Sequence, residues 1–154
     1  MRVVKTVLAL VAVALITGCA ASGPKYTEIA ASIPPVPANK GRVYFYRADT
    51  MFGAAVTSDI SLNGKVVGKS ERGSFLFADE NPGKCTVATS TEVEKQLTFM
   101  LAPGETKYVE TSVSMGVMVG RISPQLVGAE QARNEISSGL AYTGAPLAGA
   151  SAKK

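Results

Sequence analysis

The sequence predicts an all-β fold, an antiparallel β-sandwich of seven or eight strands with a short C-terminal helix. Three observations lead to this prediction. Apolar and polar residues alternate with a period of two in successive runs between residues 42 and 127. Gly or Pro turn signals separate these runs at intervals of about 8 to 12 residues, a spacing typical of sandwiches. The longest stretch with helical spacing comes late, at residues 129–138.

The first predicted strand, Arg42–Arg47, is dense in β-branched and aromatic residues. Alternation directs Val43 and Phe45 to one face of the sheet and Tyr44 and Tyr46 to the other. Both sets are apolar or aromatic, so we expect a central strand that is covered on both faces.

A hairpin follows. Residues 56–62 alternate and lead into Asn63-Gly64, and residues 65–69 form the return strand. Asn-Gly accepts the positive φ angles of a type I′ turn and is the strongest short-range hairpin signal.

The remaining elements follow turn residues in the same way. The alternation predicts strands at residues 73–77, 84–91, 96–101, 106–113 and 117–122, with an extension of the last strand past Pro124 to residue 127 left open. Residues 129–138 then predict a helix that stops near Gly139 and whose apolar face consists of Ala129, Ala132, Ile136 and Leu140.

Residues 1–18 have the pattern of a bacterial lipoprotein signal peptide. Arg2 and Lys5 precede an apolar run, Val7–Ile16, that is too short to span a bilayer, since spanning takes about 20 helical residues. The next residues complete a lipobox, Leu15-Ile16-Thr17-Gly18-Cys19, so we expect cleavage between Gly18 and Cys19. Two alternatives stay open, a coincidental cysteine after an ordinary signal peptide and an uncleaved helix.

Lipidation of Cys19 has consequences for location and for the thiols. We expect a covalent lipid on Cys19 and no other cofactor. Because Ala20 follows, where many inner-membrane lipoproteins carry Asp, we expect anchoring in the outer membrane on its periplasmic face. Cys85 is then the one remaining thiol and has no intramolecular disulfide partner. Its place in an alternating run predicts a small buried side chain.

The chain divides into the signal peptide, an anchor and Pro-rich tether (19–40), the sandwich domain (41–140) and a flexible Ala/Gly-rich tail (141–154). The prolines at 34, 35 and 37 favour an extended tether that holds the domain away from the membrane. A short helical turn docked on the domain is also compatible with the spacing of Tyr26, Ile29, Ala30 and Ile33.

Composition excludes several kinds of chemistry. The 154 residues include no His and two Cys, so a Ser-His-Asp triad, a Cys-His dyad, an imidazole-bound metal and a Cys₄ zinc site cannot form. Residues 41–140 carry 10 basic and 11 acidic side chains, so we expect no nucleic-acid partner. Asp79-Glu80-Asn81 lacks the spacing of a calcium loop, and we expect no metal. Glu92 and Glu94 share one side of an extended segment, but we interpret them as an exposed strand end and predict no catalytic residues.

Two apolar loops are candidate partner-binding segments. They are rich in Met and Gly, which make adaptable surfaces suited to a protein partner or to a lipid surface. The simpler interpretation, which we favour from the sequence, is that both loops complete the core at the ends of the sandwich. The residues concerned are Met51 and Phe52 after the first strand, and Met115 and Met118 before the last one.

Two arginines border these apolar runs. Arg47 and Arg121 each present a planar guanidinium that suits the anchoring of a partner. An internal pair with a carboxylate is the alternative that we favour for both.

Four motifs between Lys40 and Tyr108 resemble, in sequence and in order, those of a family of small bacterial lipoproteins that carry a domain of unknown function, number 2846. The resemblance covers residues 33–127 and implies an immunoglobulin- or transthyretin-like sandwich on a lipid anchor, with no assigned activity. Members often have His where this chain has Cys85, so a role that depends on that imidazole is not available here. The motifs are Lys40–Arg47, Asn63–Gly68, Pro82–Val87 and Gly104–Tyr108.

From these features we expect a non-enzymatic outer-membrane lipoprotein that serves as an accessory or scaffolding module in a periplasmic or envelope assembly, with an envelope protein as partner. The alternative is a periplasmic carrier of a small ligand or lipid, with a pocket between the sheets or under the apolar loops. An unusual hydrolase built on Ser, Lys or carboxylates is a third hypothesis.

Overall fold

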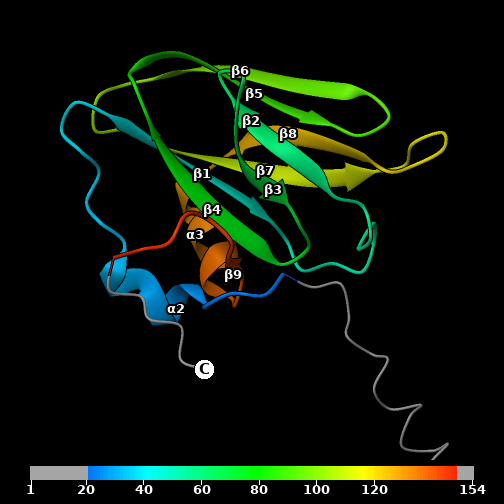
Figure 1. The fold of residues 1–154 in the computed structure, drawn as a ribbon, viewed down its shortest axis with the longest axis horizontal. Coiled ribbons are helices and arrows are strands. Elements are labelled where there is room, and N and C mark those ends of the chain that lie inside the picture. The colour runs from blue at the N-terminus through cyan, green and yellow to red at the C-terminus, as the bar shows by residue number, and fades with distance from the viewer. Residues whose placement is uncertain (1–20, 149–154) are drawn as a thin grey trace, which may run out of the picture.

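Two stacked β-sheets, with helices on the outer side of one of them, make up the computed structural model, which describes residues 21–148 (Figure 1). The five-stranded sheet has the order β8-β7-β1-β4-β9, and the four-stranded sheet has the order β3-β2-β5-β6. The all-β sandwich prediction is confirmed. Gly18 and Cys19, the predicted cleavage and lipidation residues, lie outside the described residues.

Nine strands and three short helical segments are found in the described part of the chain. The helical segments are α2 (Tyr26–Ile29), the 3₁₀ turn η2 (Ala30–Ser32) and α3 (Ala129–Ser137). The strands are β1 (Gly41–Arg47), β2 (Ser58–Leu62), β3 (Lys65–Ser70), β4 (Ser74–Glu80), β5 (Gly83–Ser90), β6 (Glu94–Leu101), β7 (Thr106–Ser114), β8 (Arg121–Val127) and β9 (Ala141–Tyr142).

Most predicted elements have their counterpart, and the main difference concerns β8. The sequence predicts a strand from residue 117, whereas residues 117–120 form a loop and the strand instead continues past Pro124. β8 is an edge strand, and a proline is tolerated there because its missing N–H costs no ladder hydrogen bond. The predicted hairpin turn is confirmed, with φ of 50° at Asn63 and 81° at Gly64.

The five-stranded sheet is mixed, which corrects the prediction of a purely antiparallel fold. β1 pairs antiparallel with β4 but parallel with β7, and β4 pairs parallel with β9. Parallel neighbours need a long crossover connection. The chain between β1 and β7 supplies one, since it forms β4 and the whole four-stranded sheet on the way.

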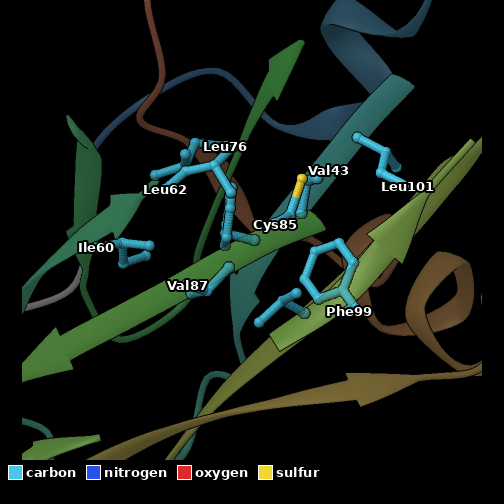
Figure 2. Packing of buried hydrophobic residues seen from close by; sticks show 10 residues of the cluster. Val43, Ile60, Leu62, Leu76, Cys85, Val87, Phe99 and Leu101 are labelled. Atoms are coloured by element: carbon cyan, nitrogen blue, oxygen red, sulfur yellow. The ribbon is translucent and has the colours of Figure 1, made fainter. Parts of the chain in front are cut away.

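The main core lies between the two sheets, and Figure 2 shows its side chains converging from both. Val43 and Phe45 of β1 belong to it, and Tyr44 and Tyr46 belong to the opposite face, as the alternation predicts. Cys85 is a fully buried member of this core. The complete set of buried residues is Val43, Phe45, Ile60, Leu62, Leu76, Cys85, Val87, Phe99, Leu101 and Val109.

A second apolar cluster covers the outer face of the five-stranded sheet. The helices and β9 lie against this face, below the sheet in Figure 1. Phe75 belongs to this cluster, and its ring centroid lies 5.8 Å from that of Tyr26 and 5.4 Å from that of Tyr142. The predicted helix at 129–138 is confirmed as α3, which buries Ala132 and Ile136 here.

The predicted flexible tail begins too early. Ala141 and Tyr142 are buried in β9, which pairs with Ser74 and Phe75 of β4. The prediction rests on the Ala/Gly-rich composition of this segment, but the segment also contains Tyr142, a large side chain that belongs to the outer apolar cluster. Residues 149–154 lie outside the described residues.

Residues 21–40 do not form a free spacer, which corrects the expected tether. α2 and η2 dock on the domain as the alternative predicts, and Ile29 is buried. The N–H of Tyr142 donates to the carbonyl of Pro24 at 2.8 Å, and the N–H of Ala21 donates to the carbonyl of Arg72 at 3.1 Å. Burial of Ile29 and these main-chain bonds hold the segment along the sheet.

Candidate functional site

Four connections meet at one end of the sandwich, which we call the loop end: residues 48–57 (β1–β2), 71–73 (β3–β4), 91–93 (β5–β6) and 115–120 (β7–β8). β1 and β7 are parallel, and both run towards this end. In Figure 1 the loops after β1, β5 and β7 lie together on the right of the view. The sheets are also bonded to each other here, because Thr89 Oγ1 donates to the carbonyl of Ile122 at 2.7 Å.

The loop end carries large apolar side chains that point into solvent. Met118 is 88% exposed and Met115 is 80% exposed. This corrects the interpretation that the two Met-rich loops complete the core. The exposed set at this end is Met51, Phe52, Val93, Met115, Val117, Met118 and Val119.

At this end of the sandwich, the side chain beneath the two loops is that of Val113 and not those of the loop methionines. A Cβ built on Gly53 would lie 2.5 Å from Val113 Cγ1, and one built on Gly120 would lie 3.0 Å from the same atom. The main chains of both loops therefore close directly over Val113. Because backbone fills this space, the side chains of Met51 and Met118 are left outside.

Glu92 determines the shape of the β7–β8 loop. Its carboxylate accepts hydrogen bonds from the N–H groups of Val117 at 2.9 Å, Met118 at 2.9 Å and Val119 at 3.3 Å. Arg121 Nε donates to the same carboxylate at 2.8 Å. One acidic side chain from the β5–β6 connection thus satisfies three consecutive N–H groups, and the apolar side chains of those residues face outwards.

These bonds also determine the charge of Glu92. The N–H groups of Met118 and Val117 lower its pKa to about 2, and Arg121 and Val119 act in the same direction. A general acid or base works best with a pKa near the working pH. Glu92 is therefore a structural anion, and it is not paired with Glu94, which accepts a hydrogen bond from Gln96 Nε2.

Gly116 makes room for this arrangement. A Cβ at this position would lie 1.6 Å from the carbonyl oxygen of Val119 and 2.2 Å from Glu92 Oε1. Both distances are far below van der Waals contact, so any side chain at 116 is incompatible with the loop as it stands.

The two arginines have internal roles. Arg121 pairs with Glu92, as the favoured alternative predicts. Arg47 is 3% exposed and pairs with no carboxylate within residues 21–148, which differs from both expectations. Its guanidinium instead donates to the carbonyls of Val56 and Gly53, at 2.5 Å each, and burial lowers its pKa. It fixes the β1–β2 loop from inside and is not accessible to a partner.

A shallow depression of about 180 Å³ lies between the β1–β2 loop and β7, where Phe52, Arg47 and Glu110 are among its lining residues. Pockets that hold drug-sized ligands are larger, at about 300–1,000 Å³. Between the sheets, apolar side chains occupy the space (Figure 2).

Residues 21–148 contain neither a metal-binding cluster nor a helix suited to crossing a membrane. No group of three or more acidic or Cys side chains is placed to hold a metal ion in this part of the chain. None of the helices described there is long and apolar enough to cross a membrane.

Comparison with known proteins places the chain in a family. Residues 37–122, more than half of the chain, match the family described as Protein of unknown function (DUF2846). The chain belongs to the DUF2846 family. Neither a curated protein nor a solved structure matches this DUF2846 protein. The matched region contains the whole loop end but stops before α3 and β9.

The sequence predicts Met51, Phe52, Met115 and Met118 as candidate contact residues, and the structure brings them to one end. The sequence pattern does not single out Glu92 as the residue that organises the loop. A signal was present, because Arg121 at the border of an apolar run favours a carboxylate partner, and Glu92 follows a predicted strand at a turn. The alternation predicts a strand for Val117 and Val119, whereas the structure places both in the loop before β8.

Proposed function

We propose that this DUF2846 protein is a lipid-anchored, non-enzymatic accessory module of the outer membrane, which presents its sandwich domain to an envelope protein. The observation that carries the proposal is the lipobox, Leu15-Ile16-Thr17-Gly18-Cys19, placed directly after an apolar run of signal-peptide length. The sulfur of Cys19 receives the lipid, and acyl chains attached to one residue act together as a stable anchor.

The structure supports a binding role over catalysis. The most perturbed carboxylate at the loop end, Glu92, is held as an anion by N–H groups and Arg121. Its bonds leave it no proton to exchange near neutral pH. The described residues offer a continuous sandwich with free edge strands.

An envelope protein has two edges to pair with in the four-stranded sheet, β3 and β6. Extended segments add to such edges through main-chain hydrogen bonds, and neighbouring side chains give specificity. Val66 on β3 and Met100 on β6 are exposed apolar side chains that could give such specificity to the pairing. We therefore assign partner binding to the flanks of the sandwich.

Intact-mass analysis of the protein isolated from membranes tests the anchor. We expect a mature chain that begins at Cys19 and carries the mass of a lipid, and a Cys19→Ala variant that stays unprocessed. Thiol labelling gives a second readout. Cys85 is buried, and burial raises the pKa of its thiol. Maleimide should therefore label no thiol in the native protein and one after denaturation.

A free thiol on native mature protein, or freely soluble protein in the cytosol, contradicts the anchor. For the partner, cross-linking in intact cells followed by detergent solubilisation should recover an envelope protein linked to β3 or β6. Recovery of this protein alone contradicts the accessory role.

A further inference from the structure

The exposed apolar side chains of the loop end need a partner surface. Contiguous apolar patches on soluble domains mark contacts with proteins or membranes. Here Met115, Val117 and Met118 each expose most of their side chains. Residues 111–120 contain no charged side chain at all. An apolar, uncharged protrusion of this kind suits a lipid surface as well as a protein.

The position of Ala21, the first described residue, favours a lipid surface over a protein as the partner of the loop end. The N–H of Ala21 donates to the carbonyl of Arg72 at 3.1 Å, in the β3–β4 connection. Arg72 Nη1 lies 2.9 Å from Met51 Sδ, and Arg72 Nε lies 3.0 Å from Asp49 Oδ1. The first described residue is therefore bonded to the loop end itself, next to one of its exposed methionines.

Chain length then limits how far the lipid lies from this end. Cys19 precedes Ala21 by two residues, which span at most about 7 Å when fully extended. If Cys19 carries the lipid, as the proposed function holds, the acyl chains enter the bilayer within that reach of the β3–β4 connection. No spacer of the expected length exists to lift the loop end off the membrane.

We propose that the loop end is a second membrane contact, in which Met51, Phe52, Met115, Val117 and Met118 enter the periplasmic leaflet beside the lipid of Cys19. This inference rests on the proposed lipidation and adds an orientation to it. β1 and β7 point their C-terminal ends at the bilayer, and the edges of β3 and β6 stand free at the sides for a protein partner.

Charge agrees with this orientation. At the loop end the guanidinium groups of Arg121 and Arg72 are paired with Glu92 and Asp49. Acyl chains disfavour unpaired charge, so paired groups are suited to a position at the interface. Glu71 in the β3–β4 connection and Glu94 at the start of β6 also lie near this end, so insertion is limited to the uncharged segment 111–120 and to Met51 and Phe52. The opposite end carries Lys40, Lys65 and Lys84 near its turns, together with the ion pair of Lys107 and Glu105.

The chain contains no Trp, so a single introduced Trp is a unique fluorescent reporter. Met118→Trp reports on the loop end. Met100→Trp is the matched control, because Met100 is 65% exposed and pairs with Lys84 at the start of β5, at the opposite end of the sandwich. Both full-length lipidated variants are reconstituted into phosphatidylcholine vesicles whose acyl chains carry bromine, a contact quencher of Trp fluorescence.

We expect a blue shift and roughly twofold or greater quenching for Met118→Trp, and no change for Met100→Trp, since only apolar loop side chains reach the acyl region. A second pair of variants tests the cause. In a Met51→Trp background, Val117→Asp should reduce the quenching, and Val66→Asp, on exposed β3, should not. Unchanged thermal unfolding by circular dichroism verifies that all variants are folded.

Flotation of the vesicles separates this inference from the proposed function. Variants that float without quenching of Met118→Trp leave the anchor intact and overturn the membrane contact. Variants that do not float overturn the anchor, and the contact with it. Equal quenching at both ends overturns the orientation. Shielding of Met118→Trp from aqueous iodide only when envelope proteins are added assigns the loop end to a protein and also overturns the contact.

Discussion

Arg42 and Asp79 face each other across β1 and β4 and form a two-bond ion pair. Arg42 Nε lies 2.6 Å from Asp79 Oδ1, and Nη2 lies 2.8 Å from Oδ2. Nη1 donates to the carbonyl of Pro34 at 2.7 Å, and the guanidinium lies 4.2 Å above the ring of Phe77. One buried side chain thus joins the sheet to the docked N-terminal segment.

Asp79→Asn should destabilise the protein. The amide keeps one acceptor but loses the charge, which leaves the buried Arg42 guanidinium without its counter-ion. We expect the free energy of unfolding to fall by about 2 kcal/mol, measured by urea denaturation. Asp59→Asn is the control, since Asp59 is exposed and forms no ion pair among the described residues. Equal effects of the two changes contradict the assigned role.

Ile29→Ala tests the docking of residues 21–40. Ile29 is buried in the outer apolar cluster with Tyr142 and Ile136. Truncation of a buried Ile creates a cavity, so we expect a loss of about 2–4 kcal/mol in the free energy of unfolding. Met100→Ala, at an exposed site, should change it by less than about 0.5 kcal/mol. A small effect of Ile29→Ala means that this segment is a free tether after all.

Glu92→Gln should loosen the β7–β8 loop without unfolding the domain. The amide offers one acceptor oxygen in place of two and has no charge for Arg121. Hydrogen exchange at the N–H groups of Val117, Met118 and Val119 should speed up, since the carboxylate now protects them. Glu94→Gln should leave those rates unchanged. Identical exchange in both variants refutes the role of Glu92.

The same carboxylate predicts a pH dependence. The pKa of Glu92 is lowered from 4.5 to about 2 in the folded protein, chiefly by the N–H groups of Met118 and Val117. Its contribution to stability is therefore fully present above pH 4.5 and is lost as the pH falls through about 2. NMR shifts of the Val117 and Met118 amides should titrate with a midpoint near 2. A midpoint near 4.5 contradicts the bonded carboxylate.

Gly116→Ala should have the same effect on the loop by a steric route. The added methyl would lie 1.6 Å from the carbonyl oxygen of Val119, so the loop has to open. Gly128→Ala is the matched control, because nothing lies within 4 Å of a Cβ there and its φ is −65°. Faster exchange of the loop N–H groups is expected for Gly116→Ala only. Loss of protection in both variants points to a general effect of the added methyl.

Local patterns predicted those elements whose burial is periodic. The alternation of β1 separates Val43 and Phe45 from Tyr44 and Tyr46, because each set faces a different apolar cluster. The Asn63-Gly64 turn depends on two φ angles that these residues adopt readily. The face of α3 follows from its 3.6-residue spacing.

Features that depend on distant partners were not predictable in this way. β9 is two residues long, and its burial depends on pairing with Ser74 and Phe75, far away in the sequence. The loop methionines are exposed because backbone covers Val113, which no periodicity indicates. The sequence favours a carboxylate partner for Arg47, but its acceptors, such as the carbonyl of Val56, are main-chain atoms without a sequence signature.

The bond between Pro24 and Tyr142 sets an order of folding along the chain. Residues 21–40 are synthesised long before residues 141–142. Lys25 bridges Ala141, and the N–H of Tyr142 donates to Pro24, so α2 lacks these partners until residue 142 has been made. The outer apolar cluster, which contains both Ile29 and Tyr142, is therefore completed only after the strands of both sheets are available.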